Sequence, residues 1–505
     1  MFCRVLCQTG SVAYTYRTPD RDQLILLPAS IKEWLPEDHE VWTVLEVVSL
    51  LDLSRFHARH PNDGVGRRAY DPAMMLALLL YGYCIGLRSS RRIAQACRTD
   101  LGFKVICVDV VPEHDAIGRF RADHETAIGE LFTQVLLICY RAGIFTLGTI
   151  ALDGTKIAAD AALDQNRLEA AIRCEVDEIL AQAGDADADT TDDRGHWSGP
   201  GSRLPRLRAA LAQIEAERAT ADQQTRQHAQ RVADDVAGGR RPRGRLPLDP
   251  ALAVLVCQGD VHVCRQRLEQ ATTMLARLHG VNELAAAEQR LAGAQATLAV
   301  NPAVPVTYQA NTTDPDSRIM KTRAGWVQGY NAQAAVTDTQ IIVAADVTQD
   351  HNDVAQFIPM LALLGENLHA TAITEPVGVV LADAGYWSEP NATSQGPDRL
   401  IATTKDYKQR RAAREMGATQ GLPPEGLNTL EQMEHRLRTP EGTKAYTQRS
   451  SLIEPVFGNI KTNRHITGFL RRGINAVRSE WSLICTTNNI RKYATYRNNT
   501  RPATT

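Results

Sequence analysis

The chain has 505 residues and a formal net charge of −2, with 44% hydrophobic and 23% charged residues; this composition excludes a disordered chain and allows for about three domains. Its ten cysteines include no Cys-x-x-Cys pair, which excludes a zinc finger and favours free thiols in a reducing cytoplasm. The longest apolar run, residues 73–87, is too short to span a membrane, and the N-terminus lacks the apolar region of a signal peptide, so we expect a cytoplasmic protein without membrane contact.

The small net charge conceals a segregation of charge along the chain. Residues 444–501 contain eleven lysines and arginines but only two acids, Glu454 and Glu480, whereas residues 160–194 contain eleven acids and three arginines. A basic end and an acidic middle are typical of a protein that binds a polyanion through one surface.

Residues 20–142 are predicted to be helical. Asp71-Pro72 caps a helix that continues to about residue 85, Ser89 or Ser90 caps a second that contains Arg91 and Arg92, and two more follow at about 112–121 and 125–142, the last ended by Gly143. Short helices with arginines between them indicate a small DNA-binding domain. A plain helical bundle with solvated arginines is the alternative.

After Gly143 the pattern changes to that of a sheet. Apolar runs predict strands at 147–153, 326–336, 340–347, 377–382 and 400–404, and residues 353–368 have the apolar spacing of a helix. We therefore predict a mixed sheet flanked by helices, built from residues 143–160 and 311–495. Residues 161–310 have helical spacing and form a predicted insertion, either an arm for dimerisation or DNA or a spacer.

Two of the predicted strands are followed directly by an acid. Asp153 follows Ile150-Ala-Leu152, and Asp383 follows Val379-Val-Leu-Ala382. Two carboxylates on neighbouring strands repel each other, and Mg²⁺ relieves this repulsion because it takes oxygen ligands from few carboxylates and leaves room for phosphate. Either aspartate taken alone is more often a turn residue, so the inference depends on the pair.

A third carboxylate is available in the helical stretch Arg449 to Arg464. Glu454 and Lys461 lie about two turns apart on one face of such a helix, which allows the acid to face a metal and the lysine to face a phosphate. Two ions about 3.5–4 Å apart can then hold the attacking and leaving oxygens of a displacement at phosphorus. Ser451-x-x-Glu454 also matches a capping box, which would make Glu454 structural.

These motifs resemble those of bacterial insertion-sequence transposases with a DDE catalytic domain. The matching stretches are 151–157, 313–321, 329–335, 381–386 and 446–461, and the helical segment 70–120 is also similar. The resemblance implies a ribonuclease-H-like fold in which Asp153, Asp383 and Glu454 bind two Mg²⁺ ions, with Mn²⁺ as a substitute. It implies cleavage of the ends of a mobile element and their transfer to target DNA.

The resemblance also implies further contacts and partners. Lys461, Arg464, Arg449 and Tyr446 would hold DNA near the reacting strand, although relatives commonly have three residues, not four, between the arginine and the glutamate. Double-stranded DNA and a homodimer or higher multimer are the expected partners, in a nucleoid-associated protein. A nuclease without strand transfer and a non-catalytic DNA-binding derivative are the alternatives.

Tyr386 or Trp387 is expected either to stack on an unpaired base or to pack in the core.

Overall fold

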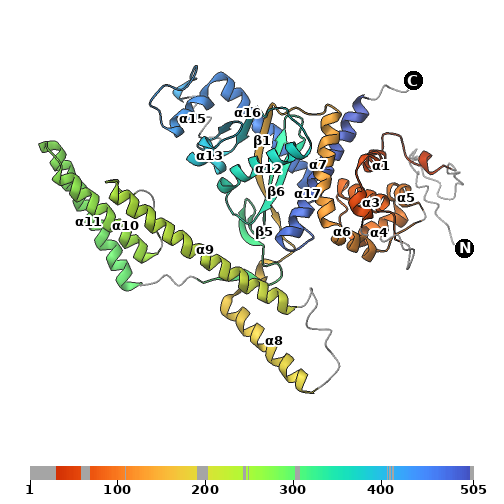
Figure 1. The fold of residues 1–505 in the computed structure, drawn as a ribbon, viewed down its shortest axis with the longest axis horizontal. Helices are drawn as coiled ribbons and strands as arrows, with labels where there is room; N and C mark the ends of the chain where they lie inside the picture. Colours follow the sequence, from red (N-terminus) through yellow and green to blue (C-terminus); the bar gives the residue numbers. More distant parts are fainter. Residues whose placement is uncertain are drawn as a thin grey trace, which may run out of the picture.

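The computed structural model of the chain describes residues 30–58, 69–108, 110–189, 203–242, 246–247, 249–301, 307–405, 408, 411 and 415–500. Figure 1 shows a group of N-terminal helices (red to orange), a central sheet with helices on it, and a long helical arm (yellow to green). This arrangement confirms the predicted mixed α/β fold with an N-terminal helical region and a sheet flanked by helices.

Short helices make up the N-terminal part. After a 3₁₀ turn, η1 (Ile31–Glu33), come α1 (Glu40–Leu50), α2 (Ser54–His57), α3 (Pro72–Cys84), α4 (Ser90–Thr99), α5 (Leu101–Cys107), α6 (His114–Asp123) and α7 (Glu125–Arg141). Asp71 caps α3 as predicted, because its carboxylate accepts the backbone N–H groups of Ala73 and Met74. Almost all of α3 is buried, which makes it the central helix of this part.

The helix α17 (Ile474–Thr500) connects these N-terminal helices to the sheet. It packs against α3, α7 and the strand β6 (Ile342–Thr348). A buried ion pair between Arg88 and Glu480 (2.6 Å) adds a polar link. One hydrophobic cluster runs from the N-terminal helices into the sheet, so the N-terminal helices share their core with the rest of the chain.

The central sheet has six strands and mixed direction. Its order is β4-β5-β1-β7-β8, and β6 pairs with β5. The pairs β1–β7 and β7–β8 are parallel, and the others are antiparallel. The strands are β1 (Thr149–Ala158), β4 (Arg318–Thr322), β5 (Gly325–Thr337), β6, β7 (Val379–Ala382) and β8 (Asp398–Ile401).

The first strand is longer than the sequence analysis predicted. It continues past Asp153 to Ala158, because the antiparallel pairing with β5 extends from Ile150 to Ala158. The prediction that the strand ends on Asp153 was therefore wrong. Parallel pairing with β7, however, stops at Leu152, so Asp153 is the first residue of β1 without a β7 partner.

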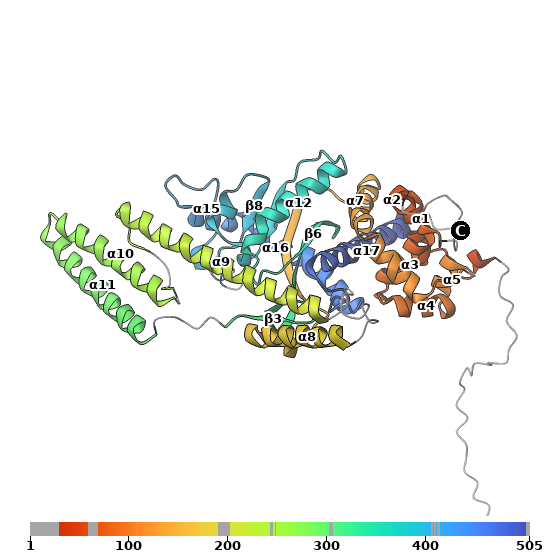
Figure 2. The same cartoon turned by 60° about the horizontal axis from the view of Figure 1, so that its bottom comes forward.

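Helices cover the sheet, as Figure 2 shows from a second direction. The helix α12 (Phe357–Ala370) packs against β6 and β5, and α16 (Pro440–Gly458) packs against β1, β5 and β7. The other elements of this part are η3 (Val354–Gln356), η4 (Ala384–Tyr386), α13 (Glu389–Thr393), α15 (Thr429–Arg438) and η5 (Asn459–Asn463), a π-helical segment. The helix that carries Glu454 thus packs against both aspartate-bearing strands.

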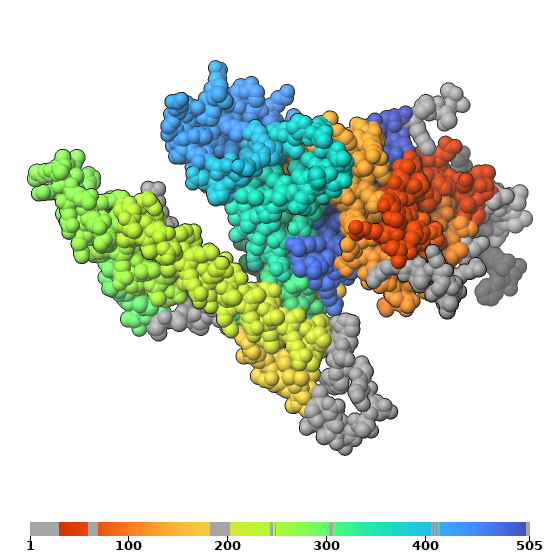
Figure 3. All heavy atoms as spheres, viewed as in Figure 1, coloured from red at the N-terminus to blue at the C-terminus, as the bar shows by residue number. Residues whose placement is uncertain are grey.

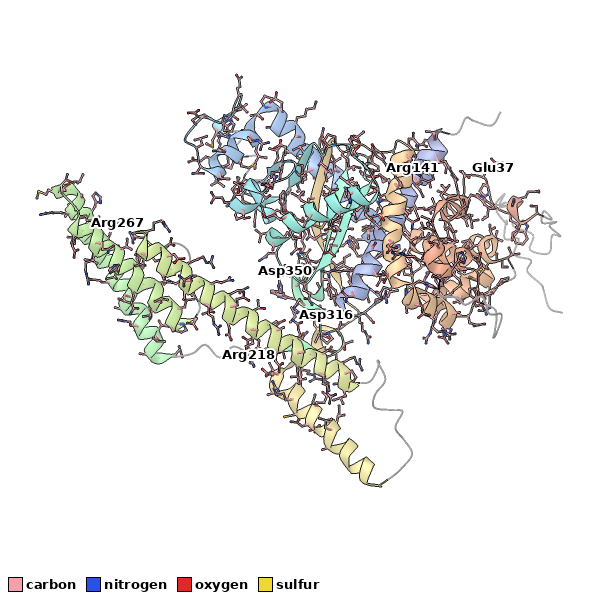
Figure 4. All side chains as sticks on the ribbon, in the orientation of Figure 1. Glu37, Arg141, Arg218, Arg267, Asp316 and Asp350 are labelled. Atoms are coloured by element: carbon pink, nitrogen blue, oxygen red, sulfur yellow. The ribbon has the colours of Figure 1, made fainter. Side chains whose placement is uncertain are left out.

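The residues between β1 and β4 form the arm. It contains α8 (Glu169–Asp189), α9 (Arg203–Ala237), α10 (Pro250–Glu269) and α11 (Met274–Val300), and its base is closed by η2 (Leu163–Gln165) and the antiparallel pair β2 (Asn166–Leu168) and β3 (Gln309–Asn311). Figure 3 shows the arm projecting from the rest of the molecule. At its base Arg218, labelled in Figure 4, pairs with Glu169 (2.5 Å), and Arg318 of β4 pairs with Glu217 (3.2 Å).

The arm has two helices, α10 and α11, in a stretch where the apolar spacing continues without interruption. Apolar residues recur with helical spacing from Cys264 to Leu278, but α10 ends at Glu269 and the Thr273 side chain caps α11. Leu278 is consequently exposed. A capping side chain here takes precedence over apolar spacing.

In the part of the chain that the structure describes, no helix is both long and apolar enough to cross a membrane.

Candidate active site

Asp153 and Asp383 lie on neighbouring strands at the point where the pairing of those strands ends. The parallel register runs from Thr149 opposite Val379 to Leu152 opposite Ala382, so the next residue of each strand is an aspartate. Adjacent strands lie about 4.8 Å apart. The two carboxylates therefore interact electrostatically.

Burial and repulsion act together on Asp153. Burial raises the pKa of its carboxyl group to about 6, and the neighbouring Asp383 carboxylate adds to the rise. The Arg449 guanidinium and the Gly154 N–H group, which donates to Asp153 Oδ1 (2.8 Å), oppose it. Keeping Asp153 ionised at neutral pH thus costs free energy, and a cation held by both carboxylates would offset this cost.

Arg449 brings a positive charge to the acidic pair. It lies on α16, and its Nη1 atom is 3.0 Å from Asp153 Oδ2. Its side chain is only 6% exposed, and its guanidinium lies 6.0 Å from the centre of the Tyr446 ring. Of the predicted DNA-binding set, Arg449 therefore lies beside Asp153, and Tyr446 lies beside Arg449.

Glu454 is on the same helix, but on another face of it. It lies five positions after Arg449, which corresponds to about 140° around an α-helix, and its side chain is exposed. Within the described ranges, no three His, Cys, Asp or Glu side chains are grouped to hold a metal. The structure thus brings together two of the three predicted metal ligands and places the third on the adjoining helix.

The helix boundaries exclude a capping-box role for Glu454. The cap of α16 is Thr439, whose side chain accepts the Gly442 N–H group. Ser451 lies in the helix interior, where its hydroxyl donates to the Gln448 carbonyl (2.7 Å). Glu454 is therefore not required for starting a helix.

Lys461 reaches β1 from the π-helical segment η5. Its Nζ atom donates to Thr155 Oγ1 (2.6 Å) and to the Lys156 carbonyl (2.8 Å). Burial lowers the pKa of this ammonium group, and the charge of Lys156 acts in the same direction. Because side chains alternate along a strand, Thr155 and Asp153 share a face of β1, so Lys461 lies on the side of the strand that carries Asp153.

The buried position of Arg464 contradicts the predicted contact with DNA. It is 2% exposed, and its guanidinium donates to the carbonyls of Tyr83 and Ile484 and to the Thr487 hydroxyl. A side chain whose donors are satisfied inside the core is not available to a phosphate. The close approach also explains Gly86, which has a positive φ of 81° and where a Cβ atom would lie 2.2 Å from the Arg464 carbonyl oxygen.

A polar cluster that was not predicted from the sequence lies on the other face of β1. Asp353 Oδ1 accepts hydrogen bonds from Asn331 Nδ2 (2.7 Å) and Gln333 Nε2 (2.8 Å), and the ammonium of Lys156 lies 3.6 Å away. Asn331 and Gln333 are both buried in β5. Two amides at alternate positions of an otherwise apolar strand were the available signal, since buried polar groups require partners.

Tyr386 packs in the core and does not face solvent. It is fully buried, and its hydroxyl donates to Gln333 Oε1. Trp387 is partly buried and packs against the same hydrophobic core. Of the two interpretations for these aromatic residues, the positions favour core packing, and for Tyr386 they exclude stacking on a base.

The remaining basic residues differ in accessibility. Arg91 and Arg92 are exposed on α4, where Ile93, Ala94 and Cys97 form the buried face. In contrast, the arginines near the C-terminus mostly form ion pairs within the fold: Arg471–Glu125, Arg472–Asp160, Arg478–Asp346, Arg491–Glu40 and Arg497–Glu46. The expected basic surface is therefore not provided by the C-terminal run, whose charges are largely neutralised by acids of other segments.

The residues present fit a divalent cation. Asp153 and Asp383 supply hard oxygen ligands, and Arg449 only partly opposes the rise in the pKa of Asp153 that burial and then Asp383 cause. Oxygen-only ligation with few carboxylates favours Mg²⁺ or Mn²⁺ over metals that prefer nitrogen or sulfur.

Two family descriptions match separate parts of the chain. Residues 29–123 match a transposase domain (DUF772), and residues 399–494 match a transposase DDE domain. The second match contains Glu454 and Lys461, whereas Asp153, Asp383 and the arm lie outside both matches. No curated protein sequence and no solved structure matches the chain.

Proposed function

Because this chain belongs to the DDE transposases, we propose that it cleaves the ends of a mobile DNA element and joins them to target DNA. Water first hydrolyses a phosphodiester at the element's end, and the released 3′-hydroxyl then attacks a phosphodiester of the target. The observation that carries the proposal is the pair Asp153 and Asp383 at the end of the β1–β7 register. Such a pair of carboxylates is the core of a two-metal phosphoryl-transfer site.

Asp153, Asp383 and Glu454 are the proposed metal ligands. Asp153, Asp383 and Glu454 would together hold the ions through their carboxylate oxygens. When bound, two Mg²⁺ or Mn²⁺ ions supply the charge stabilisation that hydrolysis and transesterification at phosphorus require. The packing of α16 on β1 and β7, together with the spacing of Glu454 from Lys461, supports Glu454 as the third ligand.

The basic residues are assigned to DNA according to their positions. Lys461 and Arg449, with Tyr446 beside it, lie where they can hold the reacting strand next to Asp153. Arg91 and Arg92 are exposed on a short helix and are proposed to contact element ends. Arg464 is left out because its guanidinium donates to the core carbonyls of Tyr83 and Ile484, whereas the guanidinium of Arg449 pairs with Asp153 itself.

We assign recognition of the ends to residues 20–142, catalysis to residues 143–160 and 311–495, and an accessory role to the insertion 161–310. The transposase families imply DNA binding. A homodimer or higher multimer that holds two element ends together is part of the proposal, because two ends must be joined in one event.

A strand-transfer assay with pre-nicked element ends tests this function. Joined product in the presence of Mg²⁺ is expected from the wild type and not from Asp383→Asn. Cleavage without joined product would instead support a nuclease, and binding without cleavage would support a non-catalytic DNA-binding protein. Either result would overturn the proposed transfer reaction.

A further inference from the structure

Lys156 is paired with Asp353, a carboxylate that borders Gly385 together with Asp383. Its Nζ atom is 3.6 Å from Asp353 Oδ1, and the two side chains are 18% and 22% exposed. A Cβ atom at Gly385 would lie 3.4 Å from Asp353 Oδ2 and 3.0 Å from Asp383 Oδ1, so the partner of Lys156 lies beside the acidic pair. Because the group is shielded from water, these charge interactions are stronger than at an exposed site.

Asp353 is held in place by the sheet. Its Oδ1 atom accepts hydrogen bonds from Asn331 and Gln333 (2.7 and 2.8 Å), which are buried side chains of β5. Asn331 Nδ2 is also 3.2 Å from the Asp350 carbonyl. Two fixed amide donors therefore determine where the Asp353 carboxylate lies, and thus where it can hold Lys156.

Gly154 provides the space for this arrangement. A Cβ atom at Gly154 would lie 2.3 Å from Gln333 Nε2 and 2.6 Å from Asp353 Oδ1. Gly154 directly follows Asp153. Lys156, two residues after Gly154, lies on the same face of β1 as Gly154. The polar cluster is therefore built directly against the strand that carries the first proposed metal ligand.

We propose that Asp353 is a positioning residue that holds the Lys156 ammonium away from Asp153 and Asp383, so that these two carboxylates stay available to a divalent cation. A lysine without this partner would turn its flexible side chain towards the remaining acids. An ammonium beside Asp153 and Asp383 would compensate part of their negative charge. The two carboxylates would then bind a divalent cation more weakly. The inference rests on the metal-binding function proposed above.

Calorimetric titration of the full chain with Mn²⁺, without DNA, tests the proposal. Asp353→Asn removes the charge but keeps an oxygen acceptor for Asn331 and Gln333, and it is expected to weaken Mn²⁺ binding by about 10- to 100-fold, as for other residues that orient metal ligands. Replacing Lys156 by Met in that background is expected to restore affinity to within about threefold of wild type, because coupled residues are not additive.

The matched control is Glu366→Gln, which removes an exposed carboxylate from the neighbouring helix α12 and should leave Mn²⁺ affinity unchanged. A loss caused by misfolding of Asp353→Asn would persist in the double variant, whereas a loss caused by the free ammonium would not. Wild-type affinity in Asp353→Asn, or no recovery in the double variant, would overturn the inference alone. Absence of Mn²⁺ binding by the wild type would overturn the proposed function with it.

Discussion

Arg449 and Asp153 form an ion pair across 3.0 Å, and this contact connects α16 to β1. The guanidinium is one of the groups that oppose the rise in the pKa of Asp153 caused by burial and by Asp383. Arg449 therefore favours the ionised form of Asp153, which is the form that binds a cation. The helix that carries Glu454 is positioned by the same contact.

Replacing Arg449 by Gln should raise the pKa of Asp153 above its present value of about 6. Cation binding needs the ionised carboxylate, so affinity falls as the pH drops through this pKa. The midpoint of Mn²⁺ affinity against pH should therefore move to higher pH in the variant. Arg449→Lys keeps the charge and should shift it less. An unchanged midpoint in Arg449→Gln would show that the ion pair does not control Asp153.

Asp383→Asn should stabilise the metal-free protein at pH 7.5. The folded-state pKa of Asp153 is raised, so the folded state binds this proton more tightly and stability falls as the pH rises from about 4 to about 6. Removing the Asp383 charge removes one cause of the rise. Urea unfolding should show a gain of about 1 kcal/mol at pH 7.5 and almost none at pH 4. Equal stability at both values would contradict the repulsion.

The position of the acidic pair could be predicted from the sequence because it depends on local pattern. An acid directly after a buried apolar strand has to leave the core, and this holds for Asp153 and Asp383 even though β1 continues beyond Asp153. The direction of Glu454 could not be predicted in the same way. It depends on where α16 begins and on the π-helical segment that follows, and a shift of one residue turns a helical side chain by about 100°.

The burial of charged groups could not be predicted, because it depends on contacts between segments that are far apart in the sequence. Arg464 contacts the Tyr83 carbonyl, 381 residues away in the chain, so no local pattern distinguishes it from a DNA-binding arginine. Asp353 joins the site only because the register of β5 against β1 places Asn331 and Gln333 on one face. The local pattern therefore identifies the two acids but not the residues that support them.

Gly154→Ala should destabilise the protein by about 1–3 kcal/mol, the usual cost of overfilling a packed site. The added methyl group would collide with Gln333 and Asp353, and Gln333 is buried and cannot move freely. Gly365→Ala is the matched control, since a Cβ atom at that exposed position of α12 meets nothing within 4 Å; it should be neutral or stabilising. Thermal unfolding of both variants measures the difference. Equal melting temperatures would mean that the cluster can rearrange.

Glu454→Gln should abolish cleavage without affecting stability, whereas Glu480→Gln should lower stability. Glu454 is exposed, so its substitution should change stability by less than about 0.5 kcal/mol while abolishing cleavage. Glu480 is buried, pairs with Arg88 (2.6 Å) and accepts the Leu470 N–H group, so its substitution should cost about 3 kcal/mol. Urea unfolding and cleavage rates on the same preparations separate the two roles. Normal cleavage by Glu454→Gln would remove it from the proposed metal site.

DNA recognition by the N-terminal helices has to be tested in the full chain. These helices share one hydrophobic cluster with the sheet and α17, and the Arg88–Glu480 pair crosses the same boundary. A fragment that ends near Gly143 would expose this core, so we expect it to be unstable. Loss of DNA binding in the fragment would then report on folding and not on recognition.

The joint substitution of Arg91 and Arg92 by Ala should weaken binding to element ends and reduce its salt dependence. Both side chains are exposed on α4, and removing one arginine from a phosphate lowers the slope of log affinity against log salt by about one. The slope should therefore fall by about two, with the melting temperature unchanged. Arg98→Ala on the same helix is the control, since Arg98 is paired with Glu113 (3.1 Å) and should contribute less to the slope. Titrations of labelled ends between low and physiological salt provide the measurement. An unchanged slope in the double variant would place the DNA-binding surface on another part of the molecule.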